Sequence, residues 1–374
     1  MHFQKQHSFL FMKHISLLLT LLVCFATSAV AQAPNLYMGS EQQPIRIRTG
    51  AVYQQYADQD RRLSQLSFPV SAFIPFTRSL ALSLFTNPAM ISGEAVESLE
   101  GLSDAQVALS YYQSIGEGSI VVSFGTNVPS GKRELTEDEF ATTALVSQDF
   151  YRFYVPVFGQ GLNLSPGITL AYPLGDNMVG GVGFAYQIKG SYNPVADMVD
   201  SFKPGNEIMI TGGLDFRLAE SWALSSNVTY VLYQEDELGD VSVFDSGDQA
   251  IIALQVLGNM GNNQARLVAR YRTKAKSQLP AGDLIVTAPR TVPEQFQFAG
   301  NYTLNIQENL RASVIGRIRH YQATDFFEEK TLFDLGASPE VAFNQSVSAV
   351  MRFVYTFGSF PGVEIGGGLV FSIQ

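Results

Sequence analysis

The C-terminal part of the chain alternates between apolar and polar residues in two consecutive runs. From Val347 to Phe357 the odd positions are apolar or aromatic, and the even positions are mostly smaller or polar. The run 363–373 repeats this order, with Leu369 and Phe371 in the apolar set and Glu364 in the other. Because side chains alternate across a β-strand, each run predicts a strand with two unlike faces. The apolar face packs inward in a soluble sandwich, but it faces lipid in a transmembrane barrel.

Similar runs recur along the chain and predict an all-β protein. The expected strands are 46–56, 63–74, 78–86, 103–113, 118–127, 161–172, 177–188, 206–217, 221–233, 247–258, 264–275, 294–304, 309–320, 330–343, 347–357 and 363–373. These make a single transmembrane antiparallel β-barrel of about 16 strands, an even number as expected when both ends of the chain lie in the periplasm. The alternative is 14 strands, because 46–56 does not hold one parity and Pro339 interrupts 330–343. The last strand is expected to close the sheet against the first.

Short and long connections alternate between the expected strands. Short ones fall near residues 75–77, 115–118, 173–176, 219–221, 259–263, 305–308 and 344–346, and long ones near 86–101, 127–160, 190–205, 234–246, 275–293 and 322–329. Outer-membrane barrels have short periplasmic turns and long extracellular loops, which this order matches. Within 127–160, Thr136 and Glu139 fit a helix capping box. The sequence therefore allows a short helix near 136–147, over the pore or folded into it, or else an ordered surface loop.

The start of the chain has the pattern of a secretory signal peptide. A basic residue precedes the apolar run from Ile15 to Phe25, and small residues follow before Gln32. We expect 1–31 to be cleaved, with Met12 as an alternative start, 32–44 to be a short periplasmic segment, and 45–374 to form the barrel. Cleavage would remove Cys24, the one cysteine of the chain, so the mature protein forms no disulfide. Export to the bacterial outer membrane fits these features, and a secreted soluble β-sandwich is the alternative.

The net charge of the chain is −10 at pH 7, and loss of Lys5 and Lys13 with the signal peptide makes it −12. This acidity argues against nucleic acid as a partner. Acidic residues gather in the expected loops, for example Glu134 to Glu139 and Glu235 to Asp248. Clustered carboxylates can hold divalent cations, but the spacing matches no EF-hand and a solvated acidic surface is the alternative.

Cations share one parity on two of the expected strands. They are Arg266, Arg270, Arg272 and Lys274 on one strand and Arg311, Arg317 and Arg319 on the other. Charge on a lipid-facing side is costly, so these side chains are expected to line the lumen. They would attract anionic solutes or carboxylate head groups. The alternative is a wall neutralised by Glu207, Asp215 or an inserted acidic loop.

No catalytic or metal-binding motif is evident in the expected mature chain. It contains one histidine, His320, at the end of an expected strand, which leaves no histidine–cysteine cluster. A lone histidine is the base of a serine hydrolase only with a partner serine, and the sequence marks none. We therefore expect no enzyme, no cofactor and no metal site.

The strand and loop step Ser119–Lys132, ending Asn127-Val128-Pro129-Ser130-Gly131-Lys132, resembles a feature of one group of outer-membrane barrels. These are the transporter-like proteins of the phenol-degradation (MetA) pathway group, similar in architecture to long-chain fatty acid channels. The resemblance implies passive uptake of small solutes, hydrophobic or anionic, by a barrel surrounded by outer-membrane lipids and lipopolysaccharide and inserted by the barrel assembly machinery. The alternative is a plugged or narrow barrel with a structural or surface-interaction role. The sequence identifies neither the solute nor the oligomeric state.

Overall fold

A computed structural model describes residues 43–59, 61–94, 96–281, 284–288 and 292–373. The expected signal peptide 1–31 and nearly all of the expected periplasmic segment 32–44 lie outside the described residues, so both stay predictions.

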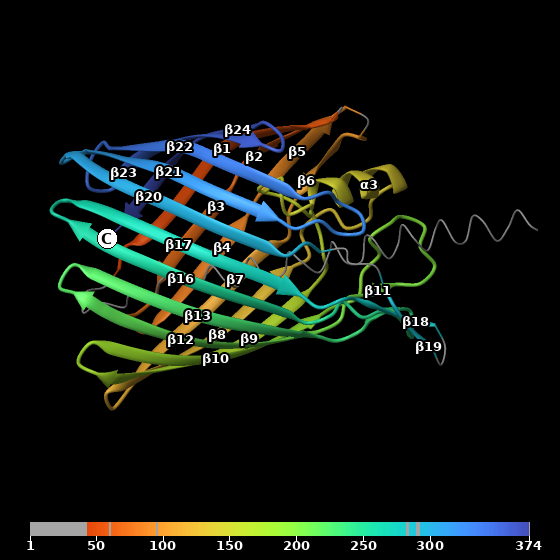
Figure 1. The fold of residues 1–374 in the computed structure, drawn as a ribbon, viewed down its shortest axis with the longest axis horizontal. Coiled ribbons are helices and arrows are strands. Elements are labelled where there is room, and N and C mark those ends of the chain that lie inside the picture. Colours follow the sequence, from red (N-terminus) through yellow and green to blue (C-terminus); the bar gives the residue numbers. More distant parts are fainter. Residues whose placement is uncertain (1–42, 60, 95, 282–283, 289–291, 374) are drawn as a thin grey trace, which may run out of the picture.

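One antiparallel sheet closes on itself to form a barrel (Figure 1). Its strands are β1 (Ile45–Asp58), β2 (Arg61–Ser67), β3 (Val70–Pro75), β4 (Leu80–Thr86), β5 (Pro88–Gly93), β6 (Leu99–Leu102), β7 (Ala105–Ile115), β8 (Gly118–Val128), β9 (Asn163–Gly175), β10 (Met178–Lys189), β12 (Glu207–Ala219), β13 (Trp222–Tyr233), β16 (Gln249–Met260), β17 (Asn263–Lys274), β20 (Gln295–Gln307), β21 (Leu310–Tyr321), β22 (Lys330–Ala342), β23 (Val347–Gly358) and β24 (Gly362–Ile373). Three barrel strands are each interrupted by a short break, which divides them into β2 and β3, β4 and β5, and β6 and β7. The barrel therefore has 16 strands, which confirms the predicted fold.

The barrel closes where the last strand pairs with the first. β24 runs antiparallel to β1 from Ile45↔Ile373 to Tyr56↔Gly362 without a shift of register. The two strands that the sequence marked as weakest, 46–56 and 330–343, both belong to the barrel. β22 tolerates Pro339, because pairing with β23 continues in the same register on either side of it, at Ala337 and Glu340.

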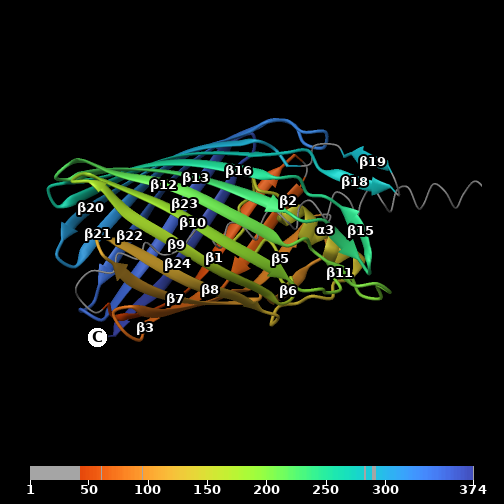
Figure 2. The same cartoon turned by 90° about the horizontal axis from the view of Figure 1, so that it is seen from below.

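Short turns and long loops gather at opposite ends of the barrel (Figures 1 and 2). We call these the turn end and the loop end. The expected long connection 86–101 is wrong, because β5 and β6 occupy most of it. These strands are too short to show a clear alternation, and it is their pairing with each other and with β2 that makes them strands. Beyond the barrel, a small sheet of β11 (Phe202–Lys203), β14 (Asp236–Leu238) and β15 (Val241–Phe244) and a hairpin of β18 (Gln278–Ala281) and β19 (Leu284–Thr287) lie at the loop end.

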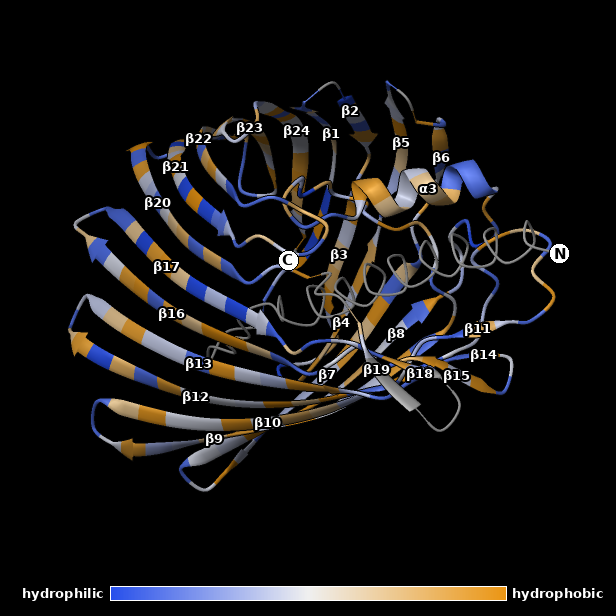
Figure 3. Cartoon of the chain, turned by 45° about the vertical axis from the view of Figure 1, so that its right-hand side comes forward, coloured by the Kyte–Doolittle hydropathy of each residue, from blue (hydrophilic) through white to orange (hydrophobic). Residues whose placement is uncertain are grey.

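Apolar and polar residues alternate along the barrel strands (Figure 3), and many large apolar residues of one parity are exposed. Leu267 on β17 and Ile318 on β21 are 42% and 40% exposed, and their polar neighbours in sequence point inward. On β24, Leu369 is 39% exposed, while Glu364 accepts a hydrogen bond from Gln54 inside the barrel. A contiguous apolar surface of this kind is what lipid contact requires. Among the described residues, no helix is long and apolar enough to cross a membrane.

The closing seam predicts a stability test at Gly50, which pairs with Gly368 across β1 and β24. A Cβ at Gly50 would lie against the carbonyl oxygen of Gly367, well inside van der Waals contact. We expect Gly50→Ala to destabilise the folded barrel by about 1–3 kcal/mol, as overpacking does. The measurement is the temperature at which the heat-modifiable band of the folded barrel disappears from a gel. Gly316→Ala is the matched control, because no atom lies within 4 Å of its Cβ position. Equal transition temperatures for the two variants would contradict the close packing of the seam.

Candidate functional site

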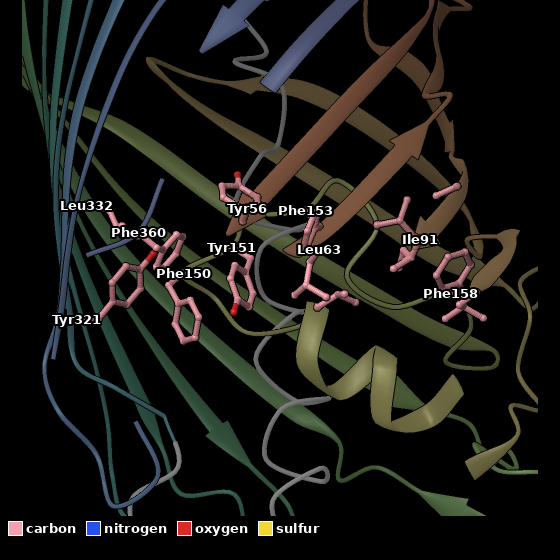
Figure 4. Packing of buried hydrophobic residues seen from close by; sticks show 14 of the residues in the cluster. Tyr56, Leu63, Ile91, Phe150, Tyr151, Phe153, Phe158, Tyr321, Leu332 and Phe360 are labelled. Carbon is pink, nitrogen blue, oxygen red and sulfur yellow. The ribbon is translucent and has the colours of Figure 1, made fainter. Parts of the chain in front are cut away.

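The connection between β8 and β9 folds into the barrel, and we call residues 129–162 the inward segment. It contains the helix α3 (Glu137–Val146), so the helix, and not the surface loop, is the alternative that the structure bears out for 136–147. Thr136 caps the backbone N–H of Glu139, and the Glu139 side chain accepts from the backbone N–H of Thr136. Acidic residues fill the first turn of α3, where they suit the positive end of the helix dipole. After the helix, the chain runs along the inside of the barrel (Figure 4).

The base of the inward segment is clamped to the wall at the break between β6 and β7. The Asp104 carboxylate accepts hydrogen bonds from the backbone N–H groups of Gly131, at 2.9 Å, and Gln160, at 2.7 Å. The backbone N–H of Asp104 donates to the carbonyl of Phe158 at 2.9 Å. At the break in this strand, backbone groups thus face the inward segment. The Asp104 carboxylate alone binds both ends of that segment, at Gly131 and at Gln160.

Two glutamine side chains hold the middle of the inward segment. Gln54 on β1 donates to the carbonyl of Arg152 at 3.0 Å and accepts from the N–H of Tyr154 at 2.8 Å. Gln65 on β2 donates to the carbonyl of Val155 at 2.7 Å and accepts from the N–H of the same residue at 2.9 Å. Each glutamine amide thus pairs with one carbonyl and one N–H of the inward segment, as the backbone of a neighbouring β-strand would. Since both glutamines are almost completely buried, these four bonds are shielded from water.

An aromatic cluster packs the inward segment against the wall (Figure 4). Tyr151, Phe153 and Val155 are buried, whereas Arg152 and Tyr154 between them are exposed. Alternate residues of this stretch therefore face the wall and the solvent. The buried side meets aromatic and aliphatic residues from several strands and loops, among them Tyr56, Leu63, Tyr321, Leu332 and Phe360.

The innermost part of the segment is fixed by arginines of the opposite wall. Asp149 forms an ion pair with Arg272 on β17, and its carbonyl accepts from the Tyr321 hydroxyl at 3.1 Å. Arg319 on β21 donates to the carbonyl of Phe150 at 2.7 Å. In the order of the sheet, β17 lies almost opposite the strand that carries Asp104. The inward segment therefore crosses the lumen from one side of the wall to the other.

The predicted lumen residues fall into paired and unpaired groups. Four arginines form ion pairs: Arg311 with Glu340, Arg317 and Arg319 with Asp334, and Arg272 with Asp149. Lys274 donates to Ser246 and lies over the Tyr233 ring, and Arg266 donates twice to the neutral amide of Gln255. Of the two predicted acids, Glu207 pairs with Lys189, and Asp215 is exposed on β12. The wall is thus partly neutralised. Asp334 and Glu340 contribute to this because they face Arg317 and Arg311 across the β21–β22 ladder. Their equal spacing from the connecting loop was a signal that sequence reasoning could have used.

Arg270 and Arg152 form no ion pair with any residue that the structure describes. Among the residues that the structure describes, Arg270 makes no hydrogen bond or ion pair, and it lies within electrostatic range of Arg272, Arg152 and Asp149. Arg152 sits on the exposed side of the inward segment with a positive φ of 58°. Because the two guanidinium groups lie within electrostatic range of each other, they leave unpaired positive charge where the segment crosses the lumen. Sequence analysis placed Arg270 in the lumen but missed Arg152, because its side depends on how the inward segment folds.

Other charged groups serve structure at the loop end. Lys189 and Glu207 form a buried pair, and His320 hydrogen-bonds Thr331 at 3.0 Å across the β21–β22 ladder. Within the described parts of the chain, no group of three or more histidine, cysteine or acidic residues could hold a metal ion. The expected acidic loops thus do not converge on one point there.

The fold and the apolar exterior together define this chain as a β-barrel of the outer-membrane type, and its inward segment narrows the lumen. No protein-family model matches the chain, and no curated protein matches it. Solved structures similar to it include OccAB4 of Acinetobacter baumannii, with 8% identity over 90% of this chain and 99% of that one and a TM-score of 0.47. An outer membrane channel of Pseudomonas putida F1 has 9% identity over 91% and 99%, with a TM-score of 0.40. A bacterial polysaccharide outer membrane secretin has 8% identity over 90% and 100%, with a TM-score of 0.46. Similarities this low carry no argument about family, and the resemblance to the MetA group stays a prediction.

The glutamine contacts predict how firmly the inward segment is held. Replacing Gln54 by Leu removes its hydrogen bonds to the Arg152 carbonyl and the Tyr154 N–H, at a cost of about 0.5–1.5 kcal/mol each. We expect faster hydrogen–deuterium exchange and protease cleavage within 147–160, with the barrel still folded. Gln55→Leu is the matched control on the same strand, because the Gln55 side chain bonds only to the outward Tyr53. Unchanged exchange in Gln54→Leu would mean that the two bonds do not hold the segment.

A buried carboxyl at the loop end predicts a pH dependence. Burial raises the pKa of Asp236 to about 6, and the nearby Glu207 adds to the rise. A hydrogen bond from the Gly205 N–H and the positive charges of Lys189 and Lys274 lower the pKa, but by less than burial raises it. Because the folded pKa is raised, the loop is most stable below about pH 4 and loses that stability as pH rises through 6. We expect protection factors in 234–246 to fall by roughly tenfold or more between pH 4.5 and 7.5. Asp236→Asn should abolish that change, and a loop that gains protection as pH rises would contradict the assignment.

Proposed function

We propose that this chain is an outer-membrane channel through which small anionic solutes cross passively. The observation that carries the proposal is the uncompensated pair of arginines, Arg152 and Arg270, at the level where the inward segment crosses the lumen. A constriction lined by one sign of charge raises the local concentration of counterions and excludes co-ions. Placement of the barrel in the outer membrane rests on its apolar exterior and on the expected signal peptide.

Solvent reaches the interior wall below the constriction. Asn227 on β13 and Arg266 on β17 belong to the inward parity and yet are exposed. The wall formed by β8 to β13 carries mainly small or hydroxylated inward residues, such as Ser123, Thr169 and Thr211. The charged groups are concentrated on the opposite wall, from β17 to β24. A solute that moves along the charged wall would thus meet little steric hindrance from the side chains of β8 to β13.

A plugged barrel with a structural or surface role is the second candidate, and the many anchors of the inward segment favour it. Conductance of the purified protein in planar bilayers separates the two candidates. Discrete openings with a preference for chloride over potassium support the channel. A complete lack of openings across voltages and salt concentrations would support the plugged barrel instead.

The arginine pair predicts a change in ion selectivity. In a potassium chloride gradient, Arg270→Gln should lower the permeability ratio of chloride to potassium by roughly threefold, because one uncompensated charge leaves the constriction. The readout is the zero-current potential. Arg78→Gln is the matched control, since it removes the same charge from the β3–β4 turn, away from the lumen. Identical zero-current potentials for Arg270→Gln and the wild type would remove Arg270 from the selectivity mechanism.

A further inference from the structure

The ion pair between Arg272 and Asp149 shows which chemical group the lumen arginines hold. The two side chains are 7% and 17% exposed, so the pair is largely withdrawn from water. Asp149 is the one acidic residue between the end of α3 and residue 162. Guanidinium binds carboxylates in a fixed geometry that a spherical anion cannot reproduce. The chain thus supplies its own carboxylate to an arginine of the wall.

From this contact, and resting on the proposed function, we infer that Arg272 and Arg270 form a subsite for the carboxylate of a solute, which Asp149 occupies at rest. Arg270 lies two residues from Arg272 on the same strand and face, and it makes no ion pair with a described residue. A carboxylate that approaches along the lumen meets Arg152 and Arg270 before it reaches the buried pair. It can then exchange with Asp149, because one charge-assisted contact replaces another of the same kind.

Exchange at this subsite loosens the inward segment around Asp149. Besides the ion pair, hydrogen bonds from Tyr321 to the carbonyl of Asp149 and from Arg319 to that of Phe150 hold this part of the segment. The buried Phe150 ring also packs against Tyr321 and Phe360. The Asp104 clamp and the two glutamine contacts lie further along the segment and are not affected. A solute carboxylate therefore loosens the chain around Asp149, while the packed Phe150 ring and the Asp104 clamp keep the segment attached. The solutes that open the constriction are therefore small carboxylates. Chloride crosses the lumen without displacing Asp149 from Arg272.

The test is conductance in planar bilayers with butyrate replacing chloride at constant ionic strength. We expect butyrate to raise the open probability of the wild type by twofold or more. Asp149→Asn should reach that level in chloride alone and respond no further, and Arg272→Gln should lose the butyrate response. Asp138→Asn is the matched control, since it removes a charge from the same segment at the first turn of α3. Neutral butyramide, added at equal concentration, should leave the open probability unchanged.

Hydrogen–deuterium exchange gives an independent readout that needs no current. Butyrate should speed exchange in 147–150 of the wild type and leave 158–162 unchanged, and the heat-modifiable band verifies that each variant is folded. An equal butyrate response in wild type and Asp149→Asn would overturn the subsite. Because the zero-current potential measures anion preference separately, a channel that stays anion-selective without a butyrate response refutes the subsite alone. A channel with neither property refutes the proposed function as well.

Discussion

Closure of the sheet is the constraint on which the rest of the molecule depends. A strand edge exposed to lipid leaves N–H and carbonyl groups without partners, at several kcal/mol each. The β1–β24 pairing removes that edge over its whole length. Closure also fixes the parity of every strand, so that the charged residues of β17, β21, β22 and β24 share one interior.

Within that interior, the aromatic cluster packs the inward segment against the wall, and polar contacts of two kinds hold it there. Its base and middle use an interrupted strand, a carboxylate and two amides, which bind backbone atoms and are independent of side chains in the segment. Its far end uses an ion pair that another carboxylate could replace. The first set of contacts fixes position, and the second is open to competition by a solute. This division is why a constriction can be both well ordered and responsive.

Whether a charged residue in the lumen is paired depends on the register of the strands as much as on the number of charged residues. Arg317 and Arg311 face acidic residues across a single hairpin and are compensated locally. Arg272 is compensated by a residue more than a hundred positions away in sequence, and Arg270 is not compensated by a described residue. The function of an arginine in this wall therefore depends on its neighbours across the sheet and on the inward segment.

The sequence by itself determined the all-β barrel, the approximate position of most strands, the turn and loop ends and the parity of the cations, but it left 14 and 16 strands open and missed β5 and β6. It could place most strands because alternation with a period of two is a local property of each strand. It also indicated α3, since a capping box lies within four residues. Only the tertiary structure decided the course of the inward segment, the partner of each arginine and the exposed side of Arg152. Those features arise from contacts between residues distant in sequence, such as Gln54 with Tyr154 and Asp149 with Arg272, and no local pattern encodes such contacts.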